Sequence, residues 1–150
     1  MSRNPSIVLV LNGPNLNLLG SRQPEIYGTA SLSDHIAAAN SAAVDHGLEI
    51  ESLQSNSASE LIAAIHGARG RCAAIIINPG AFTHYAWSIS DALAAFDGPV
   101  VEVHLSNPAA REPWRQVSVV APVAIGSIAG FGGQGYVLAV QAIAAHLAKS

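Results

Sequence analysis

Short apolar runs of strand length constrain the fold of this chain more than any other feature. Residues 7–11 and 72–77 are entirely apolar. A strand without polar alternation is buried on both faces, as in a parallel sheet covered by helices. Residues 100–105 form a further strand, residues 48–53 alternate as an edge strand does, and residues 117–121 give a short fifth strand. The sequence therefore predicts a five-stranded, largely buried sheet.

Helical patterns separate these strands. Ser31 or Ser33 can cap the first helix and Gly47 ends it. Strict alternation without a linker predicts one domain over residues 1–150, of the α/β class, with helices on both faces of a parallel sheet. Five strands favour the flavodoxin-like order 2-1-3-4-5, a three-layer fold with strands 1, 3 and 4 at the centre. The expected helices cover residues 31–46, 57–68, 84–96 and 134–148.

Composition limits the classes of function. Only 11% of the residues are charged, against about 25% in typical globular proteins, which indicates subunit contacts or a charge-poor monomer. A net charge of −3 argues against nucleic acid as a partner. No apolar run approaches the ~20 residues that cross a bilayer, and no signal peptide is visible, so we expect a cytoplasmic protein without a membrane partner.

Three polar clusters follow the predicted central strands. They cover residues 12–20, 78–84 and 102–107, and they are rich in asparagine, glycine, proline and histidine. The carboxyl ends of neighbouring parallel strands lie at the same edge of a sheet, so these clusters should converge. Such convergence predicts an enzyme site.

Several familiar motifs do not explain these clusters. Residues 130–135 fit G-x-G-x-x-G, but they follow the last strand and leave no room for an acidic residue ~20 positions on. The chain has no phosphate-binding G-x-x-x-x-G-K-[ST] and no G-x-S-x-G elbow. Cys72 opens a buried strand, where a thiol is usually inert. The six histidines show no metal-binding spacing, so we expect no metal site.

Two histidines stand out because they fall where strands end. They are His84 and His104, and the alternatives are a helix cap for His84 and a backbone-bonded strand end for His104. Nearby asparagines make a functional role the better hypothesis for both. The other four lie on predicted helices and are expected to be solvated: His35, His46, His66 and His146.

Three arginines can supply permanent positive charge and forked donors for a carboxylate: Arg22, Arg111 and Arg115. Tyr27 lies five residues after Arg22. A free phenol ionises near pH 10, but neighbouring guanidinium groups favour the phenolate, which could then act as a base. The alternatives are solvated arginines and a tyrosine that merely anchors its loop.

Several segments in the same order resemble the type II 3-dehydroquinate dehydratases, and together they cover nearly the whole chain. The match begins with residues 11–20 and continues through Arg22, Pro24, Tyr27 and Gly28. It goes on through residues 78–81 with Thr83, His84 and Asp91, residues 102–107 with Arg111 and Arg115, and residues 130–136.

The resemblance implies a flavodoxin-like fold and the loss of water from 3-dehydroquinate, giving 3-dehydroshikimate without metal or organic cofactor. Tyr27 matches the general base, which removes a proton beside the ketone. Arg22 matches a loop arginine that assists the base, and Arg111 lies where it could favour the phenolate. Asn15 matches the residue that positions a water on the enolate oxygen.

The same resemblance assigns the second half of the reaction. His104 matches the general acid that protonates the departing hydroxyl, and Glu102 could fix its tautomer. The residues that match the substrate-binding set are Asn78, His84, Leu105, Ser106 and Arg115.

The family assembles as trimers, four of which form a dodecamer, and Asp91 matches a residue that reaches a neighbouring subunit's site.

Two other functions stay open. A flavodoxin-like flavin carrier should have a hydroxyl-rich loop after strand 1, yet residues 12–19 contain no hydroxyl. An inactive family member should have lost Arg22, Tyr27 or His104, yet all three are present.

Overall fold

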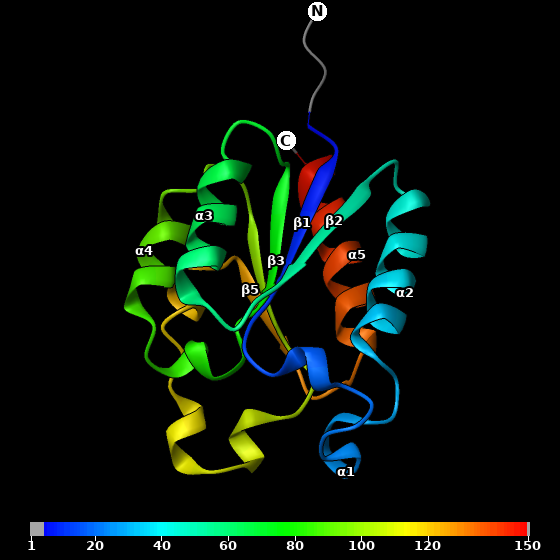
Figure 1. Ribbon diagram of the computed structural model, residues 1–150. Helices are drawn as coiled ribbons and strands as arrows, with labels where there is room; N and C mark the ends of the chain where they lie inside the picture. Colours follow the sequence, from blue (N-terminus) through cyan, green and yellow to red (C-terminus); the bar gives the residue numbers. More distant parts are fainter. Residues whose placement is uncertain (1–4, 150) are drawn as a thin grey trace, which may run out of the picture.

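A computed structural model describes residues 5–149, apart from the side chain of Tyr27. Five parallel strands form one sheet in the order β2-β1-β3-β4-β5, which confirms the predicted flavodoxin-like order (Figure 1). The strands are β1 (Ile7–Asn12), β2 (Glu49–Gln54), β3 (Ala74–Asn78), β4 (Val100–His104) and β5 (Gly126–Ala129).

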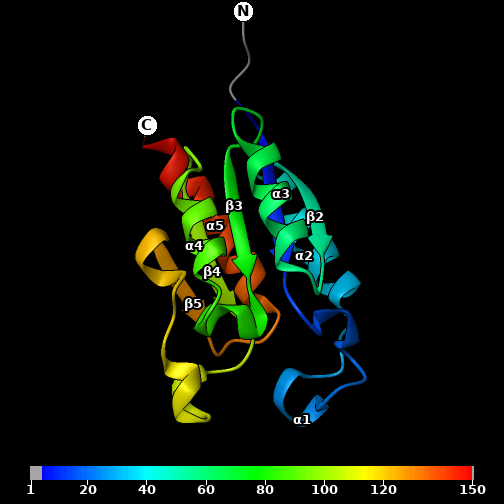
Figure 2. The ribbon, with the colours of Figure 1, turned by 60° about the vertical axis from the view of Figure 1, so that its left-hand side comes forward.

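Helices cover both faces of this sheet (Figures 1 and 2). On one face lie α2 (Leu32–Val44) and α5 (Gln134–Ala148), and on the other α3 (Ala58–Ala68) and α4 (Trp87–Ala94). Short helical segments gather at the carboxyl ends of the strands, the lower edge in Figure 1. They are η1 (Leu16–Leu18), α1 (Pro24–Tyr27), η2 (Gly80–His84), η3 (Pro108–Ala110) and η4 (Pro113–Gln116), and η5 (Ala121–Val123) precedes β5.

The central strands are apolar throughout because both of their faces are buried. Ile75 and Ile77 of β3 pack with α3 and α4, whereas Ile76 between them packs with α2 and α5. Each fully buried isoleucine contributes about 1.5–3 kcal/mol relative to an exposed one. The sheet therefore gives a rigid base for the loops at its carboxyl edge.

Side-chain caps start two of the helices. Ser31 accepts from the backbone N–H of Asp34, whose carboxylate accepts from the Ser31 N–H in return, forming a capping box. This observation selects Ser31 over Ser33 as the cap. Ser57 caps α3 in the same way by accepting from Glu60 N–H.

The predicted fifth strand at residues 117–121 is wrong. The strand beside β4 is Gly126–Ala129, and residues 117–120 form a loop. Val119 and Val120 are apolar because the loop inserts them into the core on the α3 and α4 side. The true strand was hidden because glycine, serine and alanine have low strand propensity.

Two further expectations need correction. The predicted helix 84–96 is interrupted, since η2 ends at His84 and α4 covers only Trp87–Ala94. His35 is not a solvated histidine. Its ring stacks on Tyr136 and leaves no space for a Cβ at residue 133, which explains Gly133 at that position.

Among residues 5–149, no helix combines the length and apolar character that crossing a bilayer requires.

Candidate active site

A pocket opens at the carboxyl edge of the sheet, where the three polar clusters meet. Its walls come from the loop after β1, from η2 after β3, and from the loop after β4. The convergence expected from parallel strands is therefore observed. The predicted site residues that line it are Asn15, Arg22, Asn78, His84, His104, Leu105, Ser106, Arg111 and Arg115.

The loop after β1 approaches the loop after β3 so closely that only glycine fits at residue 13. A Cβ there would lie 2.3 Å from the carbonyl oxygen of Pro79. Asn15 follows with φ 68°, in the left-handed region that asparagine tolerates better than most residues. Its backbone N–H donates to Asn56 Oδ1 at 3.0 Å, so the Asn15 backbone is held at the pocket wall.

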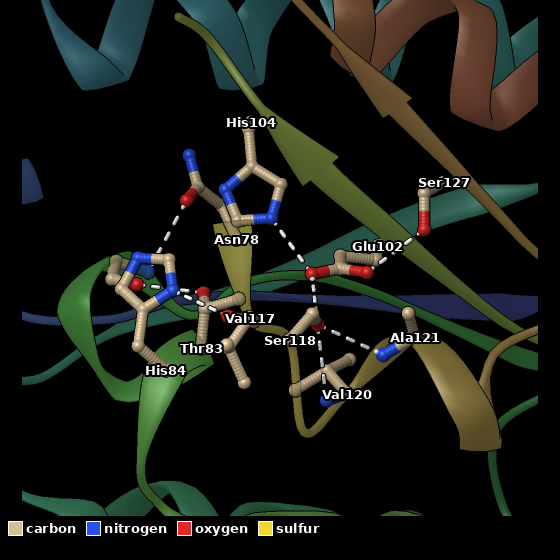
Figure 3. A network of polar contacts seen from close by, with 11 residues as sticks. Asn78, Thr83, His84, Glu102, His104, Val117, Ser118, Val120, Ala121 and Ser127 are labelled. Atoms are coloured by element: carbon tan, nitrogen blue, oxygen red, sulfur yellow. Dashed lines mark hydrogen bonds and ion pairs between the residues drawn. The ribbon is translucent and has the colours of Figure 1, made fainter. Parts of the chain in front are cut away.

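His104 ends β4 and is paired with a buried carboxylate. Its Nε2 lies 2.7 Å from Oε2 of Glu102, whose side chain is only 2% exposed (Figure 3). Glu102 is two residues earlier on the same strand, so both side chains leave the same face of the sheet. A carboxylate only accepts, so Nε2 carries the proton of this bond and Nδ1 is left as the second ring nitrogen.

Glu102 is anchored by two serines besides His104. Ser118 donates to Oε2 at 2.7 Å, and Ser127 donates to Oε1 at 2.8 Å (Figure 3). Burial raises the pKa of Glu102, but the hydrogen bonds from His104, Ser118 and Ser127 outweigh it and hold the pKa below its ordinary value. Glu102 is therefore a carboxylate at neutral pH, facing an imidazole at the pocket wall.

His84 is oriented by a different acceptor. Its Nδ1 lies 2.6 Å from the carbonyl oxygen of Val117, and its ring meets that of Trp114 edge to face at 5.2 Å. A carbonyl cannot donate, so Nδ1 carries a proton. In the neutral ring, Nε2 is then an acceptor, which suits a ligand hydroxyl.

Ser106 and two arginines line another part of the pocket. Arg111 donates to Ser106 Oγ at 3.1 Å, and this bond frees the serine hydroxyl proton for a ligand. Arg115 lines the same pocket, with Nε 2.6 Å from Glu112 Oε2 and its guanidinium 4.1 Å from the Trp114 ring centroid. Arg22 also lines the pocket, so three arginines contribute to its wall.

A buried polar chain supports the pocket floor. Tyr136 donates to Asn12 Oδ1 at 2.5 Å and accepts from Asn78 Nδ2 at 3.1 Å. Asn78 in turn accepts from Gly80 N–H at 3.3 Å, which fixes its amide orientation. Burial raises the pKa of the Tyr136 hydroxyl far above its ordinary value, so it stays protonated as the donor.

Besides Glu102, which contacts His104, two predicted residues are not placed in the lining of this pocket. The side chain of Tyr27 lies outside the described part of the structure, although its backbone belongs to α1 beside the Arg22 loop. Asp91 is exposed on α4 and does not line the pocket of its own chain. Its expected contact with a neighbouring subunit stays a prediction.

Sequence reasoning missed Ser118, Ser127, Asn12 and Tyr136. Ser118 interrupts an apolar run, which is a usable signal, but the valines of the same run favour a strand. Tyr136 carries no comparable signal, because its partner Asn12 lies 124 residues away. Within residues 5–149, no group of three or more histidine, cysteine, aspartate or glutamate side chains could hold a metal ion.

The geometry can be compared with known proteins. The family model "Dehydroquinase class II" matches residues 6–144. The chain belongs to the class II dehydroquinases. Curated relatives of this class II dehydroquinase named "3-dehydroquinate dehydratase" include one from Ruegeria pomeroyi, 54% identical over 144 residues, covering 93% of this chain and 94% of the relative. The relative from Corynebacterium glutamicum (strain ATCC 13032) is 51% identical over 140 residues, covering 93% of this chain and 97% of the relative.

Solved structures agree with this membership. The type II dehydroquinase from Propionibacterium acnes superposes with a TM-score of 0.89 at 43% identity, covering 96% of this chain and 99% of that one. The type II dehydroquinase from Butyrivibrio crossotus also gives a TM-score of 0.89, at 40% identity, covering 93% and 97% of the two chains. The class II dehydroquinase fold therefore extends over nearly the whole chain.

Proposed function

We propose that this class II dehydroquinase is a hydro-lyase of the shikimate pathway that removes water from 3-dehydroquinate by anti elimination, giving 3-dehydroshikimate. The observation that carries this proposal is the pairing of His104 with the buried Glu102 carboxylate beside an arginine-lined pocket. The pairing provides a positioned proton donor, and the arginines provide a site for an anionic substrate.

The substrate is held by groups at both ends of the pocket. The Ser106 hydroxyl and the backbone at Leu105 bind the carboxylate, and Arg111 supports Ser106 by its 3.1 Å bond. His84 offers Nε2 to a substrate hydroxyl, because Nδ1 is occupied by the Val117 carbonyl. Asn78 and Arg115 complete the binding set.

The first step is removal of a proton from the carbon beside the ketone. Tyr27 takes this proton as a phenolate, assisted by the positive charge of Arg22 and Arg111, and the electron pair moves to the ketone oxygen. Asn15 holds a water against the resulting enolate oxygen. One well-placed donor to such an oxyanion is worth about 3 kcal/mol of barrier.

The second step expels the hydroxyl. The enolate electrons return to form the new carbon–carbon double bond as the carbon–oxygen bond breaks. His104 enters this step with both ring nitrogens protonated. It gives the Nδ1 proton to the departing oxygen, so that water leaves, and keeps the Nε2 proton in its hydrogen bond to Glu102 throughout. The proton on Tyr27 then passes to solvent, and His104 takes up a proton on Nδ1 from solvent. The cycle balances without a metal or organic cofactor.

We further propose that the chain acts as one catalytic domain per subunit in a homododecamer, with Asp91 reaching a neighbouring site. Tyr85 and Trp87 are 61% and 66% exposed close to Asp91, which fits a surface covered by another subunit. Light scattering tests the assembly, and a stable monomer would contradict it. A cytoplasmic location is likewise a prediction, which cell fractionation tests.

A spectrophotometric assay tests the reaction directly. Product is a conjugated enone, so ultraviolet absorbance should rise when purified protein is added to 3-dehydroquinate in the presence of a chelator. The absence of any signal would overturn the assigned activity and favour an inactive scaffold. Activity lost only with the chelator would overturn the metal-free mechanism. A flavin carrier would be yellow, whereas we expect a colourless protein.

A further inference from the structure

Ser118 has a more restricted hydrogen-bonding environment than an ordinary surface serine. Its Oγ accepts from the backbone N–H groups of Val120 and Ala121, at 3.2 and 3.0 Å. The same oxygen lies 2.7 Å from Glu102 Oε2 (Figure 3). A hydroxyl has one proton and two lone pairs. Because the two backbone donors occupy the lone pairs, the proton of Ser118 must point at the carboxylate.

The oxygen that Ser118 contacts is the one that His104 uses. Glu102 Oε2 receives both Ser118 Oγ–H and His104 Nε2–H, each at 2.7 Å, whereas Ser127 donates to the other oxygen. Two converging donors stabilise the ionised form of Oε2, which has lone pairs for both. The direction of the serine hydroxyl therefore disfavours the arrangement in which a protonated Oε2 donates to His104 Nε2.

The loop that carries Ser118 is also held by hydrogen bonds to His84 and Thr83 of η2. The carbonyl of Val117 accepts from His84 Nδ1 at 2.6 Å, and Val119 N–H donates to the Thr83 carbonyl at 2.8 Å. Residues 117–119 thus bridge η2 and the Glu102 carboxylate. This bridge explains why the segment leaves the sheet instead of forming the strand that its valines suggest.

We propose that Ser118 is a positioning residue for the dehydration, which holds Glu102 so that His104 keeps one proton on Nε2 and presents a second, on Nδ1, to the departing hydroxyl. The inference rests on the proposed function and adds a residue that does not touch the substrate. It predicts that loss of the serine hydroxyl harms the protonation of the departing hydroxyl and leaves substrate binding nearly unchanged.

Ser118→Ala tests the proposal. We expect kcat to fall about 10- to 100-fold, the cost of losing a hydrogen bond to a charged group, with KM within about twofold of wild type. Since the second step should then limit turnover, the solvent deuterium isotope effect on kcat should rise. The isotope effect from deuterium at the carbon beside the ketone should fall. A merely structural defect would not exchange one isotope effect for the other.

Four further variants sharpen the test. Ser118→Thr keeps the hydroxyl and should recover most of kcat. Ser127→Ala should lower kcat less than Ser118→Ala does, because it leaves Oε2 and its donors intact. Ser41→Ala, on the exposed side of α2, is the matched control and should behave as wild type. If Ser118→Ala does not fold by circular dichroism, Ser118→Cys, a much weaker donor, takes its place.

The outcomes separate the two proposals. Wild-type protein without dehydratase activity overturns the proposed function and this inference with it. Active wild-type protein with unchanged kcat and isotope effects in folded Ser118→Ala overturns the role of Ser118 alone. A rise in KM at constant kcat does the same, because it would place Ser118 in substrate binding.

Discussion

The hydroxyl of Tyr136 donates to Oδ1 of Asn12 at a distance of 2.5 Å. Tyr136 lies near the start of the last helix, and Asn12 ends the first strand. Tyr136 is fully buried and also accepts from Asn78, so a single hydroxyl joins α5 to the ends of the neighbouring strands β1 and β3. The pocket floor is therefore supported by a tertiary contact between opposite ends of the chain.

Tyr136→Phe should destabilise the protein by about 1–3 kcal/mol, because the buried amides of Asn12 and Asn78 each lose a partner that water cannot replace. Chemical denaturation measures this change. Ser41→Ala is the control, since it removes a hydroxyl from the exposed side of α2. Equal stability of the two variants would show that the hydroxyl of Tyr136 is unimportant.

Tyr27→Phe should lower kcat by about 10²- to 10⁴-fold, the usual contribution of a positioned general base. Phenylalanine keeps the ring and removes the ionisable group, so substrate binding should be largely retained. Steady-state kinetics together with calorimetric substrate binding measure the two effects. Near-normal turnover would remove Tyr27 from the mechanism.

His104→Ala should slow turnover far more than it weakens binding, by a similar factor of about 10²–10⁴ in kcat. The physical reason is that hydroxide leaves poorly unless a proton reaches it. His66→Ala, exposed on α3, is the control and should match wild type. A change confined to KM would contradict the role of His104 as the acid.

Glu102 should make stability depend on pH. Its pKa in the folded chain is held below the ordinary value of 4.5, so the unfolded chain binds more protons below that pH. The stabilisation is fully present above about pH 4.5 and is lost as the pH falls through the folded pKa. Unfolding free energies of wild type and Glu102→Gln should therefore differ at pH 7 and converge on acidification.

Glu112→Gln is the control for this titration. Its pKa is also lowered, mainly by the hydrogen bond from Arg115, but the carboxylate is exposed and solvent screens the interaction. Its variant should stay close to wild type across the same pH range. A constant difference between wild type and Glu102→Gln at every pH would refute the linkage.

Local patterns were sufficient for the order of the sheet and for much of the site. The apolar runs at β1 and β3 required burial on both faces, and parallel strands then brought Asn15, Asn78 and His104 to one edge. Those predictions succeeded because they depend only on strand length, alternation and the direction of the chain. The cap at Ser31, one of the two serines predicted for it, belongs to the same local class.

The failures involve contacts between distant segments. The apolar run at 117–121 satisfies strand propensity, yet Val119 and Val120 enter the core and β5 forms from weaker strand residues. His35 follows a surface pattern on its helix but packs on Tyr136, about a hundred residues away in the chain. Local propensity cannot anticipate such partners because packing energy overrides it.

The sequence by itself determined the α/β architecture, the carboxyl edge of the sheet as the site, and the residue types present there. Only the tertiary structure decided which atom of each side chain carries the donated proton and toward which acceptor it points. The Glu102 carboxylate accepts from Nε2 of His104, and the Val117 carbonyl accepts from Nδ1 of His84. Two backbone N–H groups donate to Ser118 Oγ and so direct its hydroxyl proton toward Glu102. Hydrogen-bond direction depends on distances of a few ångströms between separate segments, and one-dimensional spacing does not contain them.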